Sequence, residues 1–511
     1  MSEQDQGNKQ TNEPDIILHI SEKGEDSNEG SRENPLWSVA KALDKVRWKS
    51  YRTAVFVIHG SITEIPARKA MIAITGKGLP AIYLRGESPE EPGKLNAADL
   101  SIRVLYVSDR NTLYLEDNIV LCGGKINYAG GAGLAIENGT VIMRGGEISG
   151  NDSGFGMGGG VYACMGSEFI MEGGLITENI TMMHGGGVFF DDRAVFTMKG
   201  GTISDNTAFL GGGGVFVGLD SDFEMTGGLI EGNICGSEKT MLLNGNSVPL
   251  GHGGGVYINP GTSFRMKGGK IINNRAISVQ EDPAAACGGG VYVEQDGVFY
   301  FEKGSLLRNG VMGHGGAVYC RGSLITSPDS TIGNNSARRG GGGVHLNGAA
   351  SFTMKGGFLL NNFTAGNGGG INILGTSSFT MESGLIAENK ASNLGHALAI
   401  EGTALIHGGV VLCDLSKDED KEDDKDRAKG NDNDKDKERV KDKDSDRDND
   451  RAEDNGKDGA QEAETQEAGI FIGETGKLTL RGGEVGGKIL MKDASHLEDL
   501  RKPEPPRDTE T

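Results

Sequence analysis

The sequence predicts an all-β protein, a parallel β-helix in which each turn of the coil, here called a rung, holds about 27 residues. Three observations support this fold class: an internal repeat with eleven copies, apolar residues that alternate within each copy, and 85 glycines among 511 residues. The glycines cluster as pairs and triplets and lack the three-residue period of collagen. They therefore mark the corners of a repeating coil.

The repeat is clearest in the motif Gly-Gly-Gly-Val-aromatic. Successive copies are 27, 27, 27, 41, 35, 27, 26, 27, 27 and 72 residues apart, so most units have one length and three carry insertions. The apolar position of the motif falls at Leu134, Val161, Val188, Val215, Val256, Val291, Val318, Val344, Ile371, Leu398 and Ile470.

A second motif, F-x-M-x-G-G-x-I-x-x-N, occurs in the same units, as in Phe169–Asn179. Phe169 and Met171 are two positions apart, and a period of two is the signature of a β-strand, whereas a glycine pair interrupts any helical face. We expect two or three short strands per unit. Stacking at about 4.8 Å then places Met171 directly beneath Met198, its equivalent in the next unit.

One asparagine recurs at the same position of nine units. A stacked amide side chain can hydrogen-bond its counterparts above and below, so the sequence predicts a structural ladder. The column comprises Asn151, Asn179, Asn206, Asn233, Asn274, Asn309, Asn335, Asn362 and Asn389.

The N-terminal region is expected to close the open end of the coil. Asn34 as N-cap and Pro35 at the first helical position predict a helix over about 35–47, with Val39, Leu43 and Val46 on its apolar face. The first strand is expected at 53–60. The predicted division of the chain is a disordered tail at 1–23, the cap and first strand at 24–60, the β-helix at 61–413, a disordered acidic insertion at 414–467, a final rung at 468–492 and a disordered tail at 493–511.

The net charge of −21 argues against nucleic acid as a partner, because phosphate binding needs basic patches. The tract 414–467 carries 23 Asp and Glu against 13 Lys and Arg, a balance of −10.

No apolar run is long enough for a membrane-spanning helix, and the first 15 residues hold no apolar signal-peptide core. The insertions 234–251, 275–286 and 414–467 leave from one corner of the coil, which either builds a recognition surface or tolerates extra residues.

Six aromatic residues are expected on the outside of the coil, between the inward positions of their strands. They form either an exposed row that binds a sugar or an apolar partner surface, or a self-stacked column beneath a loop. These candidate binding residues are Tyr162, Phe189, Phe216, Tyr257, Tyr292 and Tyr319.

Catalytic and metal sites have less support. Asp191, Asp192 and Arg193 on one unit and Asp220 and Asp222 on the next are the nearest candidates for paired carboxylates, but acidic residues after a strand are also ordinary turn residues. Histidines precede three of the glycine runs, yet one intervening rung separates each from the next, so they are not expected to share a metal ion. We expect no cofactor and no metal. These histidines are His184, His252 and His314.

The segments Gly315–Tyr319 (GGAVY) and Asn335–Ala337 (N-x-A) resemble the repeats of chlamydial polymorphic outer membrane proteins, over about 120–413 and 468–490. Upstream, G-x-D-x-N-x-G-S-x-x-N-P at 24–35 is similar to the opening of bacterial pectate-lyase-like β-helix proteins. The resemblance implies a right-handed coil, a cell-surface or secreted location, and an adhesin-like protein that binds a glycan or a protein without catalysis. The alternative it implies is a polysaccharide lyase or glycoside hydrolase.

Overall fold

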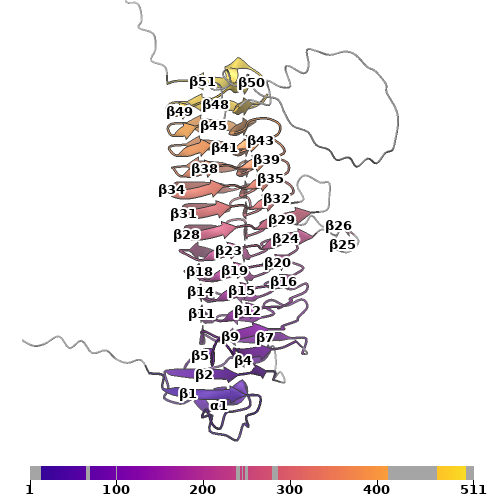
Figure 1. The fold of residues 1–511 in the computed structure, drawn as a ribbon, viewed down its shortest axis with the longest axis vertical. Helices are drawn as coiled ribbons and strands as arrows, with labels where there is room; N and C mark the ends of the chain where they lie inside the picture. The colour runs from indigo at the N-terminus through magenta and orange to yellow at the C-terminus, as the bar shows by residue number, and fades with distance from the viewer. Residues whose placement is uncertain are drawn as a thin grey trace, which may run out of the picture.

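The computed structural model describes residues 13–64, 70–98, 100–237, 251–278, 286–412 and 469–501, with the backbone of 242–243 and 246–247. The described chain forms an elongated stack of rungs that runs from the indigo N-terminal cap to the yellow C-terminal end (Figure 1). Every pairing between neighbouring rungs is parallel, as in β14 with β18. The predicted parallel β-helix is therefore confirmed.

Most central rungs contain four strands, one or two more than we expected, whereas in three rungs one long strand (β28, β31 or β34) replaces the second and third strands. In one rung these are β13 (Val161–Cys164), β14 (Glu168–Met171), β15 (Leu175–Thr177) and β16 (Ile180–Thr181). β13 belongs to one sheet, β14 and β15 to two adjoining columns of a second sheet, and β16 to a third. The fourth strand was missed because a two-residue strand is too short to show a period of two.

The remaining strands follow the same arrangement, grouped here by sheet. The 27-stranded sheet has a first column of β1 (Ile16–Ser21), β2 (Thr53–His59), β5 (Ala81–Gly86), β8 (Thr112–Leu115), β11 (Thr140–Met143), β18 (Val195–Met198), β22 (Asp222–Met225), β28 (Ser263–Ile272), β31 (Val298–Leu307), β34 (Ser323–Gly333), β37 (Ser351–Met354), β41 (Ser378–Met381), β45 (Thr403–Ile406), β48 (Lys477–Leu480) and β51 (Leu497–Asp499). Its second column has β3 (Ser61–Ile62), β6 (Gly93–Asn96), β9 (Ile119–Cys122), β12 (Glu147–Ser149), β19 (Thr202–Ser204), β23 (Leu229–Glu231), β38 (Phe358–Leu360), β42 (Leu385–Ala387), β46 (Val410–Val411) and β49 (Glu484–Val485). The 14-stranded sheet adds β4 (Ala70–Ile74), β7 (Arg103–Ser108), β10 (Leu134–Glu137), β17 (Val188–Phe190), β21 (Val215–Val217), β27 (Val256–Ile258), β30 (Val291–Val293), β33 (Val318–Cys320), β36 (Val344–Leu346), β40 (Ile371–Ile373), β44 (Leu398–Ile400), β47 (Ile470–Ile472) and β50 (Ile489–Met491). The eight-stranded sheet adds β20 (Thr207–Ala208), β24 (Ile234–Ser237), β29 (Arg275–Ser278), β32 (Gly310–Val311), β35 (Ser336–Ala337), β39 (Phe363–Thr364) and β43 (Lys390–Ala391), and β25 (Leu242–Leu243) pairs with β26 (Asn246–Ser247) in a hairpin.

The interior is a set of ladders of equivalent apolar side chains. Met171 pairs in register with Met198, as the repeat predicts, and both are fully buried. Phe196 and Phe223 stack within the same core at 4.8 Å between ring centroids. Burial of large side chains rung upon rung supplies the main stabilising free energy of a solenoid, because each rung shares its core with both neighbours.

The asparagine ladder is also confirmed. The Oδ1 of Asn206 accepts hydrogen bonds from the Nδ2 of Asn179 at 2.9 Å and from its backbone N–H at 3.1 Å. The Nδ2 of Asn206 donates in turn to Asn233 at 3.0 Å and to the Ile176 carbonyl at 2.9 Å. This pattern satisfies the buried amides of the corner that precedes the third sheet.

The N-terminal cap differs from the prediction in two ways. Strand β1 lies within the predicted tail at 1–23 and pairs with β2, so the first strand is not at 53–60. Helix α1 (Val39–Val46) is N-capped by Ser38 instead of Asn34, because Leu36 bonds to the β1 backbone and so prolongs the sheet at this point. Asp26 accepts from the Ser38 amide at 2.9 Å and fixes this start.

The C-terminal end is also more ordered than expected. After β50, residues Ala494–His496 form a 3-10 turn and β51 pairs with β48, so the predicted tail at 493–511 is wrong for 494–499. The first two insertions, 234–251 and 275–286, begin with β24 and β29, neighbouring strands of the third sheet, and so leave from one corner as expected. The tails at 1–12 and 502–511 and the acidic insertion lie outside the described residues.

Candidate functional site

The six predicted aromatic residues form one column on the outer side of the 14-stranded sheet. Successive ring centroids lie 4.7 to 5.6 Å apart with nearly parallel planes. The prediction of an exposed row is nevertheless wrong, because Phe189, Phe216, Tyr292 and Tyr319 are only 3%, 6%, 4% and 6% exposed. The structure confirms the alternative, a self-stacked column.

A second column, made of the residues before each glycine run, covers these rings. Backbone bridges link His184, Gly211, His252, Cys287 and His314 in that order, which confirms that one rung separates each histidine from the next. The Nδ1 atoms of all three histidines are buried and have no hydrogen-bond partner among the described residues, and burial lowers the pKa of each to about 4. The contacts are His184 with Phe216 at 4.6 Å, His252 with Tyr292 at 4.8 Å and His314 with His345 at 4.3 Å between centroids.

The four acidic candidates lie in the turns that follow β17 and β21 and at the start of β22. Asp192 and Asp220 adopt left-handed turn conformations with φ of +50° and +54°, and the Asp192 carboxylate binds Arg193 on its own turn. Asp222 accepts a hydrogen bond from Ser263. Within the described residues no hydrogen bond joins Asp191 or Asp192 to Asp220 or Asp222, and one buried carboxylate oxygen of Asp191 has no hydrogen-bond partner there.

The most developed polar surface lies instead on the outer face of the first rungs. In β5, β8, β11, β14 and β18 a charged residue follows the last inward apolar residue of the strand, and the sign of the charge alternates from rung to rung. Arg144 lies 3.8 Å from Glu116 and 3.4 Å from Glu172, and Lys199 lies 3.1 Å from Glu172. We call this column the charge ladder; its members are Arg85, Glu116, Arg144, Glu172 and Lys199.

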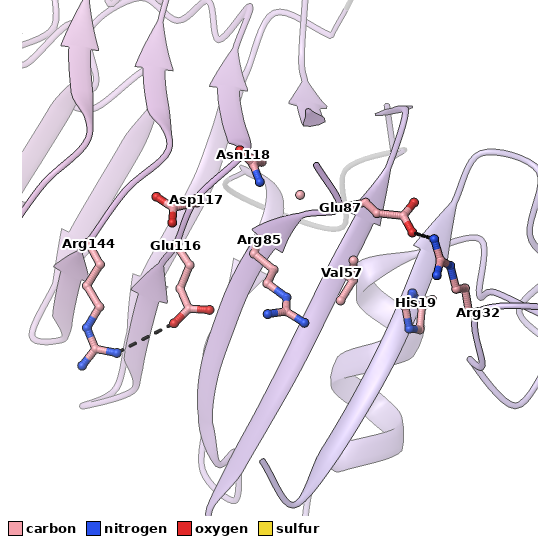
Figure 2. Close-up of a pocket in the computed structure, with 10 residues that line it drawn as sticks. His19, Arg32, Val57, Arg85, Glu87, Glu116, Asp117, Asn118 and Arg144 are labelled. Atoms are coloured by element: carbon pink, nitrogen blue, oxygen red, sulfur yellow. Dashed lines mark hydrogen bonds and ion pairs between the residues drawn. The ribbon is translucent and has the colours of Figure 1, made fainter. Parts of the chain in front are cut away.

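Arg85 is the N-terminal member of the charge ladder and lies between two ion pairs. Figure 2 shows its guanidinium between the Arg144–Glu116 pair and the Arg32–Glu87 pair. No ion pair or hydrogen bond of the Arg85 side chain occurs within the described part of the chain. An exposed guanidinium without a partner keeps all five donors available, and their fork geometry suits a carboxylate or another planar anion.

Two cavities of about 540 and 560 Å³ adjoin at Arg85, Glu116 and Arg144, which line both. We call the combined surface the Arg85 groove. Its first part is further lined by His19, Arg32, Glu87 and Asp117 (Figure 2). The volume of each part is that of a typical small-ligand pocket.

A short hydrogen-bond chain borders the first part of the groove. The ring nitrogens of His19 and His59 lie 2.8 Å apart, and His59 lies 2.6 Å from Glu87, which also pairs with Arg32. Burial, together with the charge of His59, lowers the pKa of His19. The chain fixes Glu87 and Arg32 and thereby shapes one wall of the groove.

Aromatic rings border the second part. Tyr83 and Tyr114 stack at 4.2 Å between centroids, and the Arg144 guanidinium lies 4.5 Å from the centre of the Tyr114 ring. Tyr83 lines the cavity together with Ile17 and Val55. The groove therefore combines aromatic surface with charged groups, the composition of sites that bind polar ring compounds.

The repeat motifs do not predict this site because its residues lie upstream of the glycine triplets. A signal was present: Leu84-Arg85, Leu115-Glu116 and Met143-Arg144 each place a charge directly after an inward apolar residue. Alignment of the N-terminal strands by that position would have revealed the alternating charges.

Comparison with known proteins gave no match to a protein-family model, to a curated protein or to a solved structure. Within the described ranges, no helix has the length and apolar character needed to cross a membrane. The same ranges contain no cluster of three or more His, Cys, Asp or Glu side chains arranged to hold a metal ion.

Proposed function

We propose that the protein is a non-catalytic, adhesin-like binding solenoid of a bacterial cell surface, and that the Arg85 groove binds an anionic group on a glycan or a protein. The observation that carries the proposal is Arg85 itself, an exposed cation with no ion pair to any described residue, at the end of a charge ladder whose next member, Glu116, is already paired with Arg144. The groove lies on the outer face of a continuous stack of paired strands, a surface that suits recognition of an extended partner.

The resemblance to polymorphic outer membrane protein repeats supports the adhesin-like role and the surface location. Burial of the aromatic column moves the predicted contact surface from Tyr257 and Tyr292 to the groove, where Tyr83 supplies the aromatic surface. The expected partner contributes a carboxylate or sulfate to Arg85 and a ring or apolar group to Tyr83.

The test is a glycan and surface-protein array probed with the full chain, with Arg85→Ala and with Arg338→Ala. Arg338 is an exposed arginine of another rung, so it controls for the loss of one positive charge. The proposal predicts a partner that is retained by Arg338→Ala and lost by Arg85→Ala. Equal binding by both variants would contradict it.

A carbohydrate-processing enzyme is the second candidate, because Glu87, Glu116 and Asp117 line the same cavity as Arg85. Glycoside hydrolysis needs two carboxyl groups, and lyase chemistry needs a base beside a cation. Incubation of the full chain and of Glu116→Gln with polyuronides and neutral glycans separates the candidates. Product formation that Glu116→Gln abolishes would favour the enzyme, whereas binding without turnover favours the solenoid.

A further inference from the structure

The N-terminal end of the stack carries the two tryptophans of the chain, one at each end of helix α1. Trp37 directly precedes the N-cap residue Ser38, and Trp48 directly follows the C-cap residue Arg47. The helix packs on β1, β2 and β4, which belong to two different sheets, so it lies across the open end of the coil (Figure 1). Its outer face therefore forms part of the end of the stack.

Trp48 is the more exposed of the two tryptophans, at 72% against 40% for Trp37. Its backbone has φ of +60°, a left-handed conformation that disfavours side chains other than glycine. Its N–H donates a 2.7 Å hydrogen bond to the Gly78 carbonyl, and a Cβ at Gly78 would lie 2.5 Å from the indole ring. Arg47 donates a 3.0 Å hydrogen bond to the Lys77 carbonyl and ties the same loop to α1. The loop thus holds one part of the ring and leaves most of it in water.

The surface around Trp48 is basic. Between positions 45 and 86 the chain has eight Lys and Arg residues and a single acidic residue, Glu64, which is buried. In a chain of net charge −21, a basic region of this kind indicates an anionic partner. We call Trp48, the cations within three positions of it and the cation of the Gly78 loop the Trp48 face; its members are Lys45, Arg47, Trp48, Lys49 and Lys77.

Acidic side chains near this face compensate only part of its charge. Asp109 accepts a 2.6 Å hydrogen bond from the Gly76 amide, and Asp15 accepts one from the Thr53 amide at 3.0 Å, so both carboxylates bind the backbone. Asp44 is exposed on α1. The four cations of the Trp48 face therefore exceed the acidic residues of the same stretch of chain.

An exposed indole flanked by cations is the pattern of residues that lie at a membrane–water interface. Trp rings favour the level of the lipid headgroups, and each Lys or Arg near an anionic lipid surface adds to the attraction. A partner protein instead favours one contiguous apolar patch. Here the two indoles lie at opposite ends of an eight-residue helix, roughly 12 Å long. A fluid lipid surface receives such separate rings without a matching pocket.

We propose that the Trp48 face docks the N-terminal end of the stack onto a membrane that contains anionic lipids, with the Trp48 ring at the headgroup level and Lys45, Lys49 and Lys77 against the lipid phosphates. An exposed ring in a left-handed backbone contributes little to folding, and this contact gives it a role. The proposal does not rest on the Arg85 groove, because no member of the Trp48 face lines that groove.

The test is sedimentation of the full chain with vesicles of phosphatidylcholine, alone or mixed with an equal part of phosphatidylglycerol. The protein is expected to sediment with the mixed vesicles only, and less at high salt, because salt screens the attraction. Trp37→Phe leaves Trp48 as the one indole, so its fluorescence reports on the face. The emission should shift to shorter wavelength with the mixed vesicles, as the ring leaves water, and stay unchanged with soluble polyglutamate.

Two variants separate the ring from the charges. Trp48→Ala, which removes an exposed side chain, is expected to weaken vesicle binding about tenfold. Lys45→Gln with Lys49→Gln should weaken it about twentyfold or more, since each lysine near an anionic surface contributes about fivefold. The matched control, Lys355→Gln with Lys390→Gln, removes two exposed lysines of distant rungs and should leave binding unchanged.

Four results would overturn the proposal: no sedimentation with the mixed vesicles, equal sedimentation with phosphatidylcholine alone, an unshifted Trp48 emission in the sedimented protein, or the same shift with polyglutamate. The vesicles and the array test different surfaces, so Trp48→Ala should keep an array partner that Arg85→Ala loses. Vesicle binding without any array partner would contradict the groove alone, and an array partner without vesicle binding would contradict the Trp48 face alone.

Discussion

The Nδ2 of Asn179 donates a 2.9 Å hydrogen bond to the Oδ1 of Asn206, 27 positions later in the chain and one rung along the stack. The same oxygen accepts the backbone N–H of Asn179. One side chain therefore satisfies two buried donors of the preceding rung. The asparagine ladder is thus a linear network in which each member depends on the next.

Substitution Asn206→Ala is expected to lower the free energy of unfolding by about 3 kcal/mol or more, because it leaves the two donors of Asn179 buried and unpaired. Urea unfolding followed by circular dichroism measures the loss. Asn393→Ala, at an exposed asparagine, is the control and should change stability by less than about 0.5 kcal/mol. A similar midpoint for both variants would show that the ladder is not a stabilising network.

Two glycines with similar positive φ angles allow the cost of backbone strain to be measured separately from the cost of a side-chain clash. Gly201 and Gly166 have φ of +78° and +68°, but a Cβ at Gly201 would lie 2.6 Å from the Met171 side chain, whereas nothing lies within 4 Å at Gly166. Gly166→Ala is expected to cost about 1 kcal/mol from strain alone. Gly201→Ala should cost about 1 to 3 kcal/mol more through overpacking, measured by thermal unfolding. Equal losses would exclude the clash.

The buried histidines make the stack sensitive to acid. Burial lowers the pKa of His252 to about 4, below the ordinary value of 6.5, so the folded state binds fewer protons than the unfolded state between these values. The contribution of neutral His252 to the free energy of unfolding is therefore full above pH 6.5 and is lost as the pH drops toward 4.

His252→Phe keeps a ring against Tyr292 and removes the titration. When the pH falls from 7.5 to 5, the free energy of unfolding of the variant should decrease by about 1 to 2 kcal/mol less than that of the native chain. Urea midpoints at the two pH values measure the difference. An identical acid loss in both proteins would mean that His252 is accessible to protons in the fold.

Glu64 is expected to act in the opposite direction. It is 4% exposed, and burial raises its pKa to about 7 against the opposing hydrogen bonds from the Val39 and Ala40 amides of α1. The folded state therefore binds the extra proton, and the contribution of Glu64 to stability is full below pH 4.5 and is lost as the pH rises to about 7.

Glu64→Gln should remove this pH dependence, which amounts to about 3 kcal/mol for such a shift. The measurement is the unfolding free energy of each variant at pH 4.5 and pH 8. Glu168→Gln, an exposed glutamate of β14, is the control and should keep the native slope. If the unfolding free energy of Glu64→Gln changed with pH as much as that of the native chain, the pH dependence would come from another residue.

The sequence predicted the parts of the fold that repeat. Met171 over Met198 and the asparagine ladder followed from a constant 27-residue interval, because like residues at one interval must stack in a coil. The aromatic column was predicted to point outward, but its burial depends on His252 and Cys287, which cross over it from the corner before the glycine run. The spacing of the aromatic residues in the sequence does not show that other side chains lie over them.

The Arg85 groove lies where the periodicity is weakest. The interval from Arg85 to Glu116 is 31 residues and that from Glu116 to Arg144 is 28. These intervals differ from the 27 residues that separate most of the later repeats. Only the pairing of β5 with β8 and of β8 with β11 shows that these charges adjoin. The hand of the coil stays a prediction from resemblance.

The central claim is that side chains from separate rungs, about 30 positions apart, meet on one face and form the groove. Tyr83 and Tyr114 test it most directly, because they are register partners whose rings stack at 4.2 Å. In the double variant Tyr83→Cys with Tyr114→Cys, mild oxidation and peptide mapping should find a disulfide between the two introduced thiols, since neighbouring parallel strands bring Cα atoms within bonding range. The register control, Tyr83→Cys with Thr112→Cys, should react far less. A disulfide that forms equally in the control, or not at all in the first variant, would contradict the stacked groove.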